Sequence, residues 1–175
     1  MNGFLITFEG IDGGGKSTVA SMLDQRIEHL HRSVPDENSD LILKREFVFT
    51  AEPTDGEAGQ LLRSKLRRLT RENCSGTEEL EELFLFMADH ADHLARTIKP
   101  ALDQGKVVIS DRYSDSRIAY QGVTLSGVVD HPVKWVRELH EPWSVVPNLT
   151  LLFAIDPSLA LDRCRSRYAL DEVRK

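Results

Sequence analysis

The chain has 175 residues, of which 41% are hydrophobic and 29% charged, so it is long enough for one domain with a substantial core but not for two large ones. Its 22 lysines and arginines against 28 aspartates and glutamates give a formal net charge of -6, which argues against long nucleic acid as a partner and means that any bound phosphate must be held locally. The longest apolar stretch, Leu149 to Ile155, is too short to span a membrane, and the first residues do not resemble a signal peptide, so we expect no membrane partner and a cytoplasmic location.

Along the chain, short β-branched or aromatic runs alternate with longer segments of helical period, which is typical of an α/β fold. Strands are expected at Phe4 to Phe8, Phe47 to Thr50, Lys106 to Ser110 and Asn148 to Ile155. These runs are mostly continuous in apolar residues, as in a parallel sheet that helices cover on both faces. Helices are expected at Lys16 to His31, Glu57 to Arg71, Thr77 to Gln104, Pro132 to Glu141 and Pro157 to Tyr168. The prediction is therefore a three-layer α/β/α domain with a parallel sheet.

The most complete motif follows the first strand. It reads Gly10-Ile11-Asp12-Gly13-Gly14-Gly15-Lys16-Ser17, followed by Thr18, and matches GxxxxGK[ST] between a strand and a helix, the context that a P-loop requires. Glycines let backbone N–H groups surround an anion, and the helix N-terminus adds partial positive charge. Lys16 is expected to neutralise the β- and γ-phosphates of a nucleotide, and Ser17 to bind Mg²⁺ through its hydroxyl. A glycine-rich turn that binds nothing rarely matches this fully, so the motif predicts a nucleotide phosphate site from Gly10 to Thr18.

The third expected strand ends in a carboxylate, in the run Val107-Val108-Ile109-Ser110-Asp111-Arg112. Ligands of parallel sheets collect at the carboxyl ends of strands, so Asp111 and Arg112 are expected on the same edge as the P-loop. Asp111 is then the candidate metal-side carboxylate. Taken alone, the run is equally consistent with an Asp that caps the following segment and an Arg that faces solvent.

The segment from Thr77 onward predicts a helix with two distinct faces. Apolar residues at three- and four-residue spacing predict a buried stripe of Leu80, Leu83, Phe84, Met87, Ala91, Leu94, Ala95 and Ile98. A flank of the same helix carries Phe86, His90, His93 and Thr97. This flank is available for contacts with a ligand, although periodicity is equally consistent with Phe86 widening the core and the histidines lying in solvent.

Three segments occur in a characteristic order: Phe8 to Thr18, Glu52-Pro53-Thr54-Asp55-Gly56, and Asp111-Arg112-Tyr113 followed by Ala119-Tyr120-Gln121-Gly122. Together they resemble the thymidylate kinase family over roughly residues 3 to 168. The resemblance implies a P-loop kinase fold of the nucleoside monophosphate kinase type. It also implies ATP as co-substrate, Mg²⁺ as cofactor, transfer of the γ-phosphoryl group to dTMP in dTTP biosynthesis, and a homodimer formed by packing of helix faces.

By this resemblance, Asp12 lies beside the sugar 3′-hydroxyl and the acceptor phosphate, and Arg112 binds that phosphate. Phe86 stacks on thymine, which its position off the buried stripe also favours, because a flat base gains from an aromatic face. Tyr120 lies against the deoxyribose, where its bulk disfavours a 2′-hydroxyl; plain core packing is the alternative. Glu52 and Ser116 belong to the same substrate-binding motifs.

The chain departs from the family pattern around the base. His90 stands where many members carry an Arg that hydrogen-bonds thymine, and Arg117 stands close to where members often show a small polar residue. We hypothesise that Arg117 pairs with a pyrimidine carbonyl from the opposite side, the alternative being an Arg exposed to solvent. Ala51 replaces an Arg that usually precedes Glu52, which leaves one phosphate contact unassigned, with Arg63 as a weak candidate for it.

The last expected helix begins with Asp156 before Pro157, a pair that suits a capped helix start. Its basic residues resemble the approach to the family's ATP lid, so Arg163 and Arg167 are candidate catalytic residues, a solvated basic face being equally compatible. We expect one kinase domain over residues 1–175, with the lid starting near residue 163 and the family's C-terminal strand and helix absent.

Two other functions are compatible with these motifs. The altered base pocket allows a kinase of another nucleoside monophosphate. A regulatory protein that senses ATP without transferring phosphate is the second alternative. Asp12, Arg112 and Phe86 argue against such a sensor, because it has no use for groups on the acceptor side.

Overall fold

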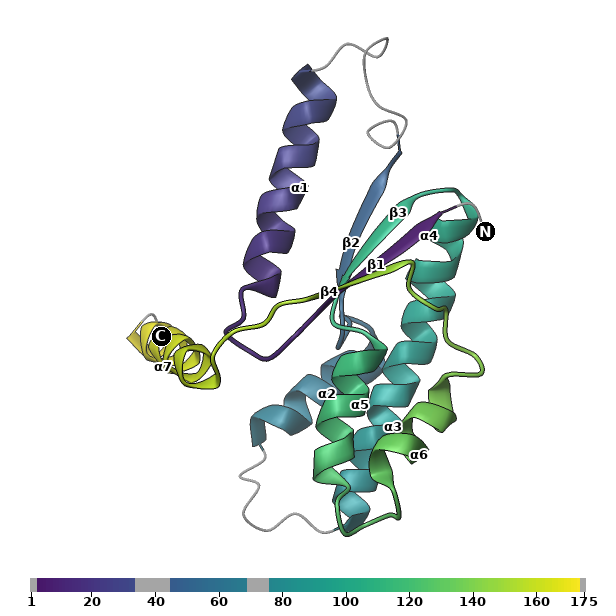
Figure 1. Ribbon diagram of the computed structural model, residues 1–175, viewed down its shortest axis with the longest axis vertical. Coiled ribbons are helices and arrows are strands. Elements are labelled where there is room, and N and C mark those ends of the chain that lie inside the picture. Colours follow the sequence, from purple (N-terminus) through teal and green to yellow (C-terminus); the bar gives the residue numbers. More distant parts are fainter. Residues whose placement is uncertain (1–2, 34–44, 69–75, 174–175) are drawn as a thin grey trace.

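The computed structural model describes residues 3–33, 45–68 and 76–173, and their strands form one parallel sheet in the order β2-β3-β1-β4 (Figure 1). The strands are β1 (Phe4–Glu9), β2 (Phe47–Ala51), β3 (Val107–Asp111) and β4 (Leu149–Leu152). All pairs are parallel, with Ile6 of β1 beside Ile109 of β3 and beside Leu149 of β4. The predicted parallel α/β sheet is thus confirmed, although β4 is shorter than expected.

The helices among the described residues are α1 (Lys16–Ser33), α2 (Glu57–Arg68), α3 (Gly76–His93), η3 (Leu94–Ile98), α4 (Lys99–Asp103), α5 (Ser114–Thr124), α6 (Pro132–His140) and α7 (Pro157–Val173). The helix predicted from Thr77 to Gln104 is the continuous run of α3, η3 and α4, in which η3 is a single π-helical turn. Helix α5 was not predicted, and α7 extends beyond its predicted end. Residues 69–71 of the second predicted helix lie outside the described residues.

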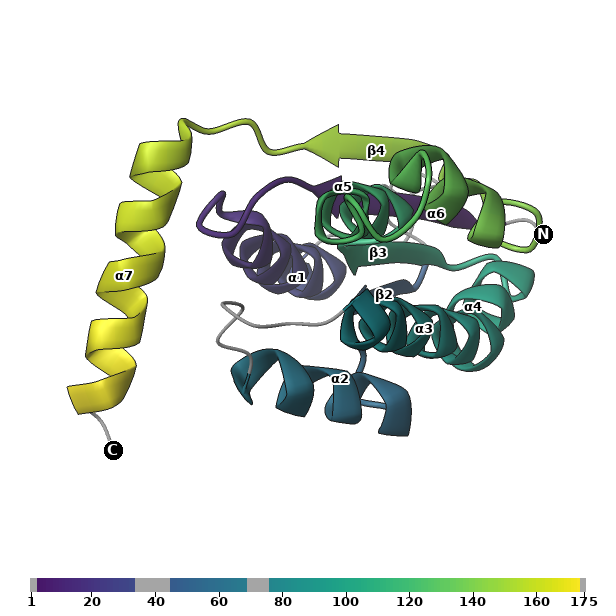
Figure 2. The ribbon, with the colours of Figure 1, turned by 90° about the horizontal axis from the view of Figure 1, so that it is seen from below.

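Helices cover both faces of the sheet, as the apolar strands predicted (Figures 1 and 2). One core cluster joins the sheet to η3 and α4 and includes Leu5, Val108, Leu94, Ile98 and Leu102. A second joins it to α1 and includes Phe8, Ile109, Ile6, Ala20 and Leu23. Successive residues of a strand point to opposite faces, which is why neighbouring residues of β1 belong to different clusters. The three-layer α/β/α architecture is therefore confirmed.

The stripe predicted to be buried along α3 is wrong in part. Phe84 is 54% exposed, and Ala91 and Ala95 are also exposed. The buried side of α3 instead carries Glu82, Leu83, Asp89, His90 and His93. Figure 1 shows the reason: within this continuous helical run, η3 and α4 lie along the sheet, while most of α3 extends past the carboxyl ends of the strands.

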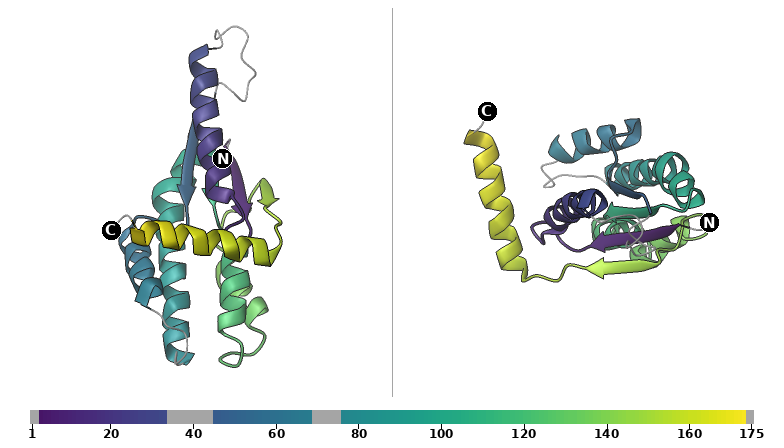
Figure 3. Two further views of the ribbon diagram at one scale, coloured as in Figure 1. Left: turned by 90° about the vertical axis from the view of Figure 1, so that its left-hand side faces the viewer. Right: turned by 90° about the horizontal axis from the view of Figure 1, so that it is seen from above.

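Helix α7 leaves the end of β4 and projects from the body of the protein beyond the P-loop (Figures 2 and 3). Its predicted cap is present: the Asp156 carboxylate accepts hydrogen bonds from the backbone N–H groups of Ser158 at 2.9 Å and Leu159 at 3.4 Å. The hydrogen bond from the Ser158 hydroxyl, followed by these two backbone hydrogen bonds, lowers the pKa of Asp156. Within residues 3–33, 45–68 and 76–173, no helix has both the length and the apolar character needed to cross a membrane.

Candidate active site

The P-loop is a tight turn between β1 and α1. Gly13 has a φ of 79°, and a Cβ at this position would collide with the carbonyl oxygen of Ala160 in α7, so only glycine fits there. Lys16 is 5% exposed, and its Nζ donates a hydrogen bond to the carbonyl of Ile11 at 3.0 Å. Burial, followed by the nearby charge of Arg112, lowers the pKa of Lys16. The loop therefore places an ammonium group at the N-terminus of α1, where the helix dipole also favours an anion.

Ser17 and Asp111 meet at this same edge of the sheet, as predicted. Strand β3 lies next to β1, with Asp111 in register with Phe8, and the Ser17 hydroxyl donates a hydrogen bond to Asp111 Oδ2. The other oxygen, Asp111 Oδ1, is buried and has no hydrogen-bond partner among the residues that the structure describes. A hydroxyl beside an unpartnered carboxylate oxygen is the kind of oxygen donor set that suits Mg²⁺.

Arg112 adopts a backbone conformation that is rare outside glycine. Its φ is 73°, and its N–H donates a hydrogen bond to the carbonyl of Phe8 at 2.9 Å, which fixes the residue against β1. The guanidinium turns back toward the P-loop, where Nη1 donates to the Gly10 carbonyl at 3.1 Å and Nη2 lies 2.6 Å from Asp12 Oδ1. It also lies over the ring of Tyr120, with 5.2 Å between Cζ and the ring centroid. Arg112 therefore does not face solvent.

A chain of hydrogen bonds runs from Arg112 into the protein. Nη1 of Arg112 donates to the Ser116 hydroxyl at 2.8 Å, and that hydroxyl donates to Glu9 Oε2 at 2.5 Å. Glu9 is 3% exposed, and burial raises the pKa of its carboxyl group. Ser116, predicted to bind substrate, thus also links the Arg112 guanidinium to the carboxyl group of Glu9 behind it.

A pocket of about 370 Å³ lies beside the P-loop, among α2, α3 and α5. Its wall includes seven residues that the sequence predicted for this site: Asp12, Glu52, Phe86, Arg112, Ser116, Arg117 and Tyr120. Leu66, Glu82 and Gln121 also line it and were not predicted as site residues. The aromatic and apolar residues form flat surfaces for a base, while Asp12 and Arg112 stand at the end nearest the P-loop.

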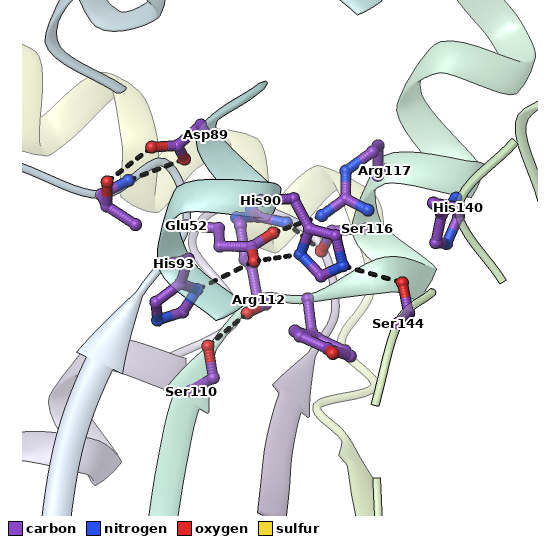
Figure 4. A network of polar contacts seen from close by, with 12 residues as sticks. Glu52, Asp89, His90, His93, Ser110, Arg112, Ser116, Arg117, His140 and Ser144 are labelled. Atoms are coloured by element: carbon purple, nitrogen blue, oxygen red, sulfur yellow. Dashed lines mark hydrogen bonds and ion pairs between the residues drawn. The ribbon is translucent and has the colours of Figure 1, made fainter. Parts of the chain in front are cut away.

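Behind the pocket, Glu52 is the centre of a buried polar network (Figure 4). Its Oε1 lies 2.7 Å from His90 Nδ1 and 2.9 Å from His93 Nδ1, while its Oε2 accepts a hydrogen bond from Arg117 Nη2 at 2.5 Å. A carboxylate only accepts hydrogen bonds, so both rings must carry their proton on Nδ1. The Nε2 atoms of His90 and His93 lie 2.8 Å from the hydroxyls of Ser144 and Thr50, respectively. Within the network, the negative charge of Glu52 is paired with the positive charge of Arg117.

The network also explains the protonation of its members. Burial raises the pKa of Glu52, but the Arg117 charge and the two histidine hydrogen bonds outweigh it and hold the pKa well below its usual range. Burial lowers the pKa of His90 despite its hydrogen bond to Glu52, in agreement with a neutral ring. Arg117 is 2% exposed, so the alternative of a solvent-facing Arg is wrong, and its Nε and Nη1 atoms are buried without a partner in the structure.

Comparison with known proteins gives this geometry a family. A family model described as thymidylate kinase matches residues 8–175. The chain belongs to the thymidylate kinase family. A probable thymidylate kinase of Methanosarcina acetivorans is 52% identical over 168 residues, which is 95% of this chain and 72% of that protein. One of Halobacterium salinarum is 45% identical over 159 residues, covering 91% and 69%. The crystal structure of thymidylate kinase from Ehrlichia chaffeensis is 30% identical, with a TM-score of 0.65 over 98% of this chain and 88% of that one.

His90 does not occupy the place that the thymidylate kinase resemblance implies. It is 0% exposed and is absent from the pocket wall, and both of its ring nitrogens are engaged, by Glu52 and Ser144. Its ring packs against Tyr113 and Trp143, with centroid distances of 4.9 and 5.1 Å. The predicted direct contact of His90 with a base is therefore wrong for this structure, as is the alternative of a histidine in solvent.

The other uncertain basic residues fall on different sides of the site. Arg63 hydrogen-bonds Asp55 at 2.6 Å and the Pro53 carbonyl, and it lines a second pocket together with Ser17 and Ala51, so its role in place of the Arg expected at position 51 stays a prediction. Arg163 Nη1 donates to the carbonyl of Gly13 at 3.3 Å, next to the phosphate loop. Arg167 is exposed, and no contact with the P-loop is found for it in the described part of the chain.

Two pocket residues that sequence reasoning missed, Gln121 and Glu82, are buried and hydrogen-bonded to each other. A signal for Gln121 was available, because Arg117 and Gln121 are four residues apart and so share one face of a helix. That pattern is polar rather than apolar, and a search for apolar stripes passes over it. Glu82 had no such signal, since its neighbours in sequence suggest an ordinary charged helix surface.

The buried histidine His140 predicts a loss of stability in mild acid. Burial, followed by the charge of Arg117, lowers its pKa to about 4, whereas an unfolded chain binds the proton near pH 6.5. The unfolded state therefore binds more protons between these values, and stability falls as pH falls. We expect the free energy of unfolding to decrease by roughly 1–2 kcal/mol between pH 7 and pH 5. Urea denaturation followed by tryptophan fluorescence at both pH values measures this change.

A matched pair of variants assigns the effect to its residue. His140 Nδ1 donates to the carbonyl of Val136 at 2.7 Å, a bond that the amide of His140→Gln can replace without titrating. The same change at exposed His31 is the control. His140→Gln should flatten the dependence on pH and His31→Gln should leave it as in the wild type; equal slopes in both variants would contradict the assignment.

Proposed function

We propose that this chain transfers the γ-phosphoryl group of ATP to dTMP, forming dTDP. The observation that carries the proposal is the position of Arg112, whose guanidinium stands between the P-loop and the pocket and contacts Gly10, Asp12 and Ser116. A cation at this junction can contact the phosphate of an acceptor while the P-loop holds the phosphates of a donor. Membership of the thymidylate kinase family supports dTMP as that acceptor.

Phosphoryl transfer depends mainly on alignment and on neutralising charge, so the chain needs neither a covalent intermediate nor a strong base. Residues Gly10 to Thr18 would surround the donor phosphates, with Lys16 as their counter-charge. Arg112 would bind the acceptor phosphate and offset its repulsion from ATP. Asp12, which lies at the boundary of the two sites, would orient the acceptor through the sugar 3′-hydroxyl and through Arg112. Ser17 and Asp111 would hold Mg²⁺, which supplies charge neutralisation at the donor phosphates.

The pocket supports a pyrimidine deoxynucleotide as the acceptor. Phe86 would stack on thymine, and Tyr120 would lie against the deoxyribose, where it excludes a 2′-hydroxyl. Arg117, held from behind by Glu52, would donate to a carbonyl of the base through nitrogens that have no partner in the structure. His90 supports this arrangement only through Glu52.

We also propose that residues 1–175 act as one P-loop kinase domain whose lid begins near residue 163. The contact of Arg163 with Gly13 supports a lid that starts beside the P-loop. Closure would bring Arg163 and Arg167 to the transferring group and exclude water, which also limits hydrolysis of ATP.

We also propose that the protein is a homodimer. An exposed stripe of apolar and small residues runs along α3 and into η3 and consists of Phe84, Ala88, Ala91 and Ala95. The same stripe of a second copy could cover it in a two-fold homodimer, and sedimentation equilibrium would distinguish a dimer from a 19.8 kDa monomer.

We place the protein in the cytoplasm, where ATP and nucleoside monophosphates are available, and cell fractionation tests that location.

A coupled ADP-release assay with a panel of monophosphates tests the proposed reaction. With ATP and Mg²⁺, we expect release of ADP that depends on dTMP, with weaker activity on dUMP and at least tenfold lower kcat/KM for dCMP, dGMP, AMP and the ribose analogue of dTMP. Preference for another monophosphate would reassign the acceptor. Binding of ATP without ADP release for any acceptor would support a sensor and contradict the proposal.

A further inference from the structure

Two buried polar side chains on the pocket wall, one helical turn apart on α5, carry atoms that have no hydrogen-bond partner among the described residues. Arg117 has two unpartnered donors, Nε and Nη1, and Gln121 has one unpartnered acceptor, Oε1. Residues at i and i+4 of a helix are neighbours on one face, with Cβ atoms about 5–6 Å apart. Leaving such groups without partners is unfavourable, so a donor and an acceptor side by side are suited to one ligand that carries the opposite pair.

The orientation of the Gln121 amide is set by Glu82. Nε2 of Gln121 lies 3.0 Å from Glu82 Oε1, and both side chains are buried. A carboxylate can only accept, so the NH₂ group must face Glu82, and Oε1 must be the atom left for another partner. Glu52 fixes Arg117 in the same way, through Nη2. Each pocket residue is thus held by a carboxylate from another element: β2 leads into Glu52, and Glu82 belongs to α3.

We infer that Glu82 is a positioning residue for base selection. It orients the Gln121 amide so that Oε1, which lies next to the donors of Arg117, accepts a hydrogen bond from a base N–H group that neighbours a carbonyl. Thymine and uracil present this pair at N3 and a neighbouring carbonyl oxygen, whereas cytosine has an unprotonated N3 that would meet Oε1 lone pair to lone pair. The inference rests on the proposed function and extends it, because it assigns the rejection of cytosine to a residue that does not itself bind the base.

Glu82→Gln tests this role with little change in size. A Gln at position 82 can donate as well as accept, so the amide of Gln121 is no longer restricted to one orientation. We expect kcat/KM for dTMP to fall about tenfold or more relative to that for dCMP, mainly through KM for dTMP, with kcat changed by less than about threefold. Glu81→Gln is the matched control, since Glu81 is exposed and pairs with Lys65 outside the pocket.

A second readout uses an altered substrate and the wild-type protein. The 3-deaza analogue of dTMP carries C–H in place of N3–H, and as a 4-hydroxy-2-pyridone it also has a hydroxyl in place of the O4 carbonyl. Because the analogue lacks the N–H donor beside a carbonyl, the wild type should lose about tenfold or more in kcat/KM with it. In Glu82→Gln that loss should be smaller, because the two changes remove the same interaction. Equal losses in both proteins would overturn the inference. A wild type that accepts the analogue as well as dTMP would overturn it even if Glu82→Gln fails to fold.

The outcomes separate this inference from the proposed function. Wild type and Glu81→Gln active on dTMP, with the dTMP preference reduced only in Glu82→Gln, would support both. A Glu82→Gln protein that loses activity equally for dTMP and dCMP would show a structural role alone and overturn the inference, while the proposed function stands. Wild type and Glu81→Gln inactive on every monophosphate would overturn both.

Discussion

Replacing Arg112 with lysine is expected to lower kcat for dTMP phosphorylation by about a hundredfold to a thousandfold. The guanidinium reaches Gly10, Ser116 and Asp12 at the same time, and its planar fork remains directed at the boundary between pocket and P-loop. A lysine ammonium is a single point charge on a flexible stem and cannot hold those contacts together. Because the charge is kept, the loss would measure alignment of the phosphate rather than simple neutralisation. Steady-state kinetics at saturating ATP and dTMP provide the measurement.

The backbone conformation at position 112 should not affect the comparison between arginine and lysine. Arginine and lysine are both non-glycine residues, so each carries the same cost of the positive φ of 73°, and folding should be little affected. Arg32→Lys is the control, since that side chain is 78% exposed at the far end of α1, where it pairs with Glu28. A kcat for Arg112→Lys within about threefold of the wild-type value would show that Arg112 does not align the acceptor.

The meeting of the P-loop and Asp111 at one edge of the sheet could be predicted from the sequence. Each of them stands at the end of an expected strand, and the carboxyl ends of parallel strands lie at the same edge. The conformation of Arg112 could not be predicted, because its positive φ is imposed by the hydrogen bond to Phe8, a residue more than 100 positions earlier in the chain. Local sequence preference alone would place Arg112 elsewhere.

The buried residues at the wall of the pocket were harder to predict from the sequence than the residues beside the P-loop. Periodicity gives the face of α3 on which His90 lies, but not how deeply that face is buried or which group meets it. The group that meets His90 is Glu52, which stands 38 residues earlier and on another element. Because its carboxylate binds the ring, His90 makes a contact inside the protein in place of the predicted contact with a ligand. Helix α5 was missed for a related reason: its inner residues Arg117 and Gln121 are polar, and their burial depends on Glu52 and Glu82.

Loss of Glu52 should have the largest effect on stability. We expect Glu52→Ala to lower the free energy of unfolding by about 3–5 kcal/mol, because it leaves the buried charge of Arg117 unpaired and removes the acceptor for His90 and His93. Urea denaturation at pH 7 measures the change.

The stability of Glu52→Ala should also depend on pH in a different way from that of the wild type. The wild-type carboxylate, whose pKa lies well below its ordinary value of 4.5, contributes stability that is fully present above that value and lost as pH falls below it, and this loss should be absent in Glu52→Ala.

A double-mutant cycle distinguishes an unpaired charge from a simple cavity. If most of the cost comes from the isolated guanidinium, Arg117→Met should restore part of the stability of Glu52→Ala, since methionine occupies similar space without a charge to solvate. The coupling between the two changes should then be about 1–3 kcal/mol. Additive losses would mean that Glu52 and Arg117 stabilise the fold independently, and the carboxylate would then not be what holds Arg117 at the pocket wall. The dependence on pH gives an independent check, because the difference in stability between the wild type and Glu52→Ala should narrow below about pH 4.5. There the Glu52 carboxyl group binds a proton in the unfolded wild type, while in the folded protein it stays ionised.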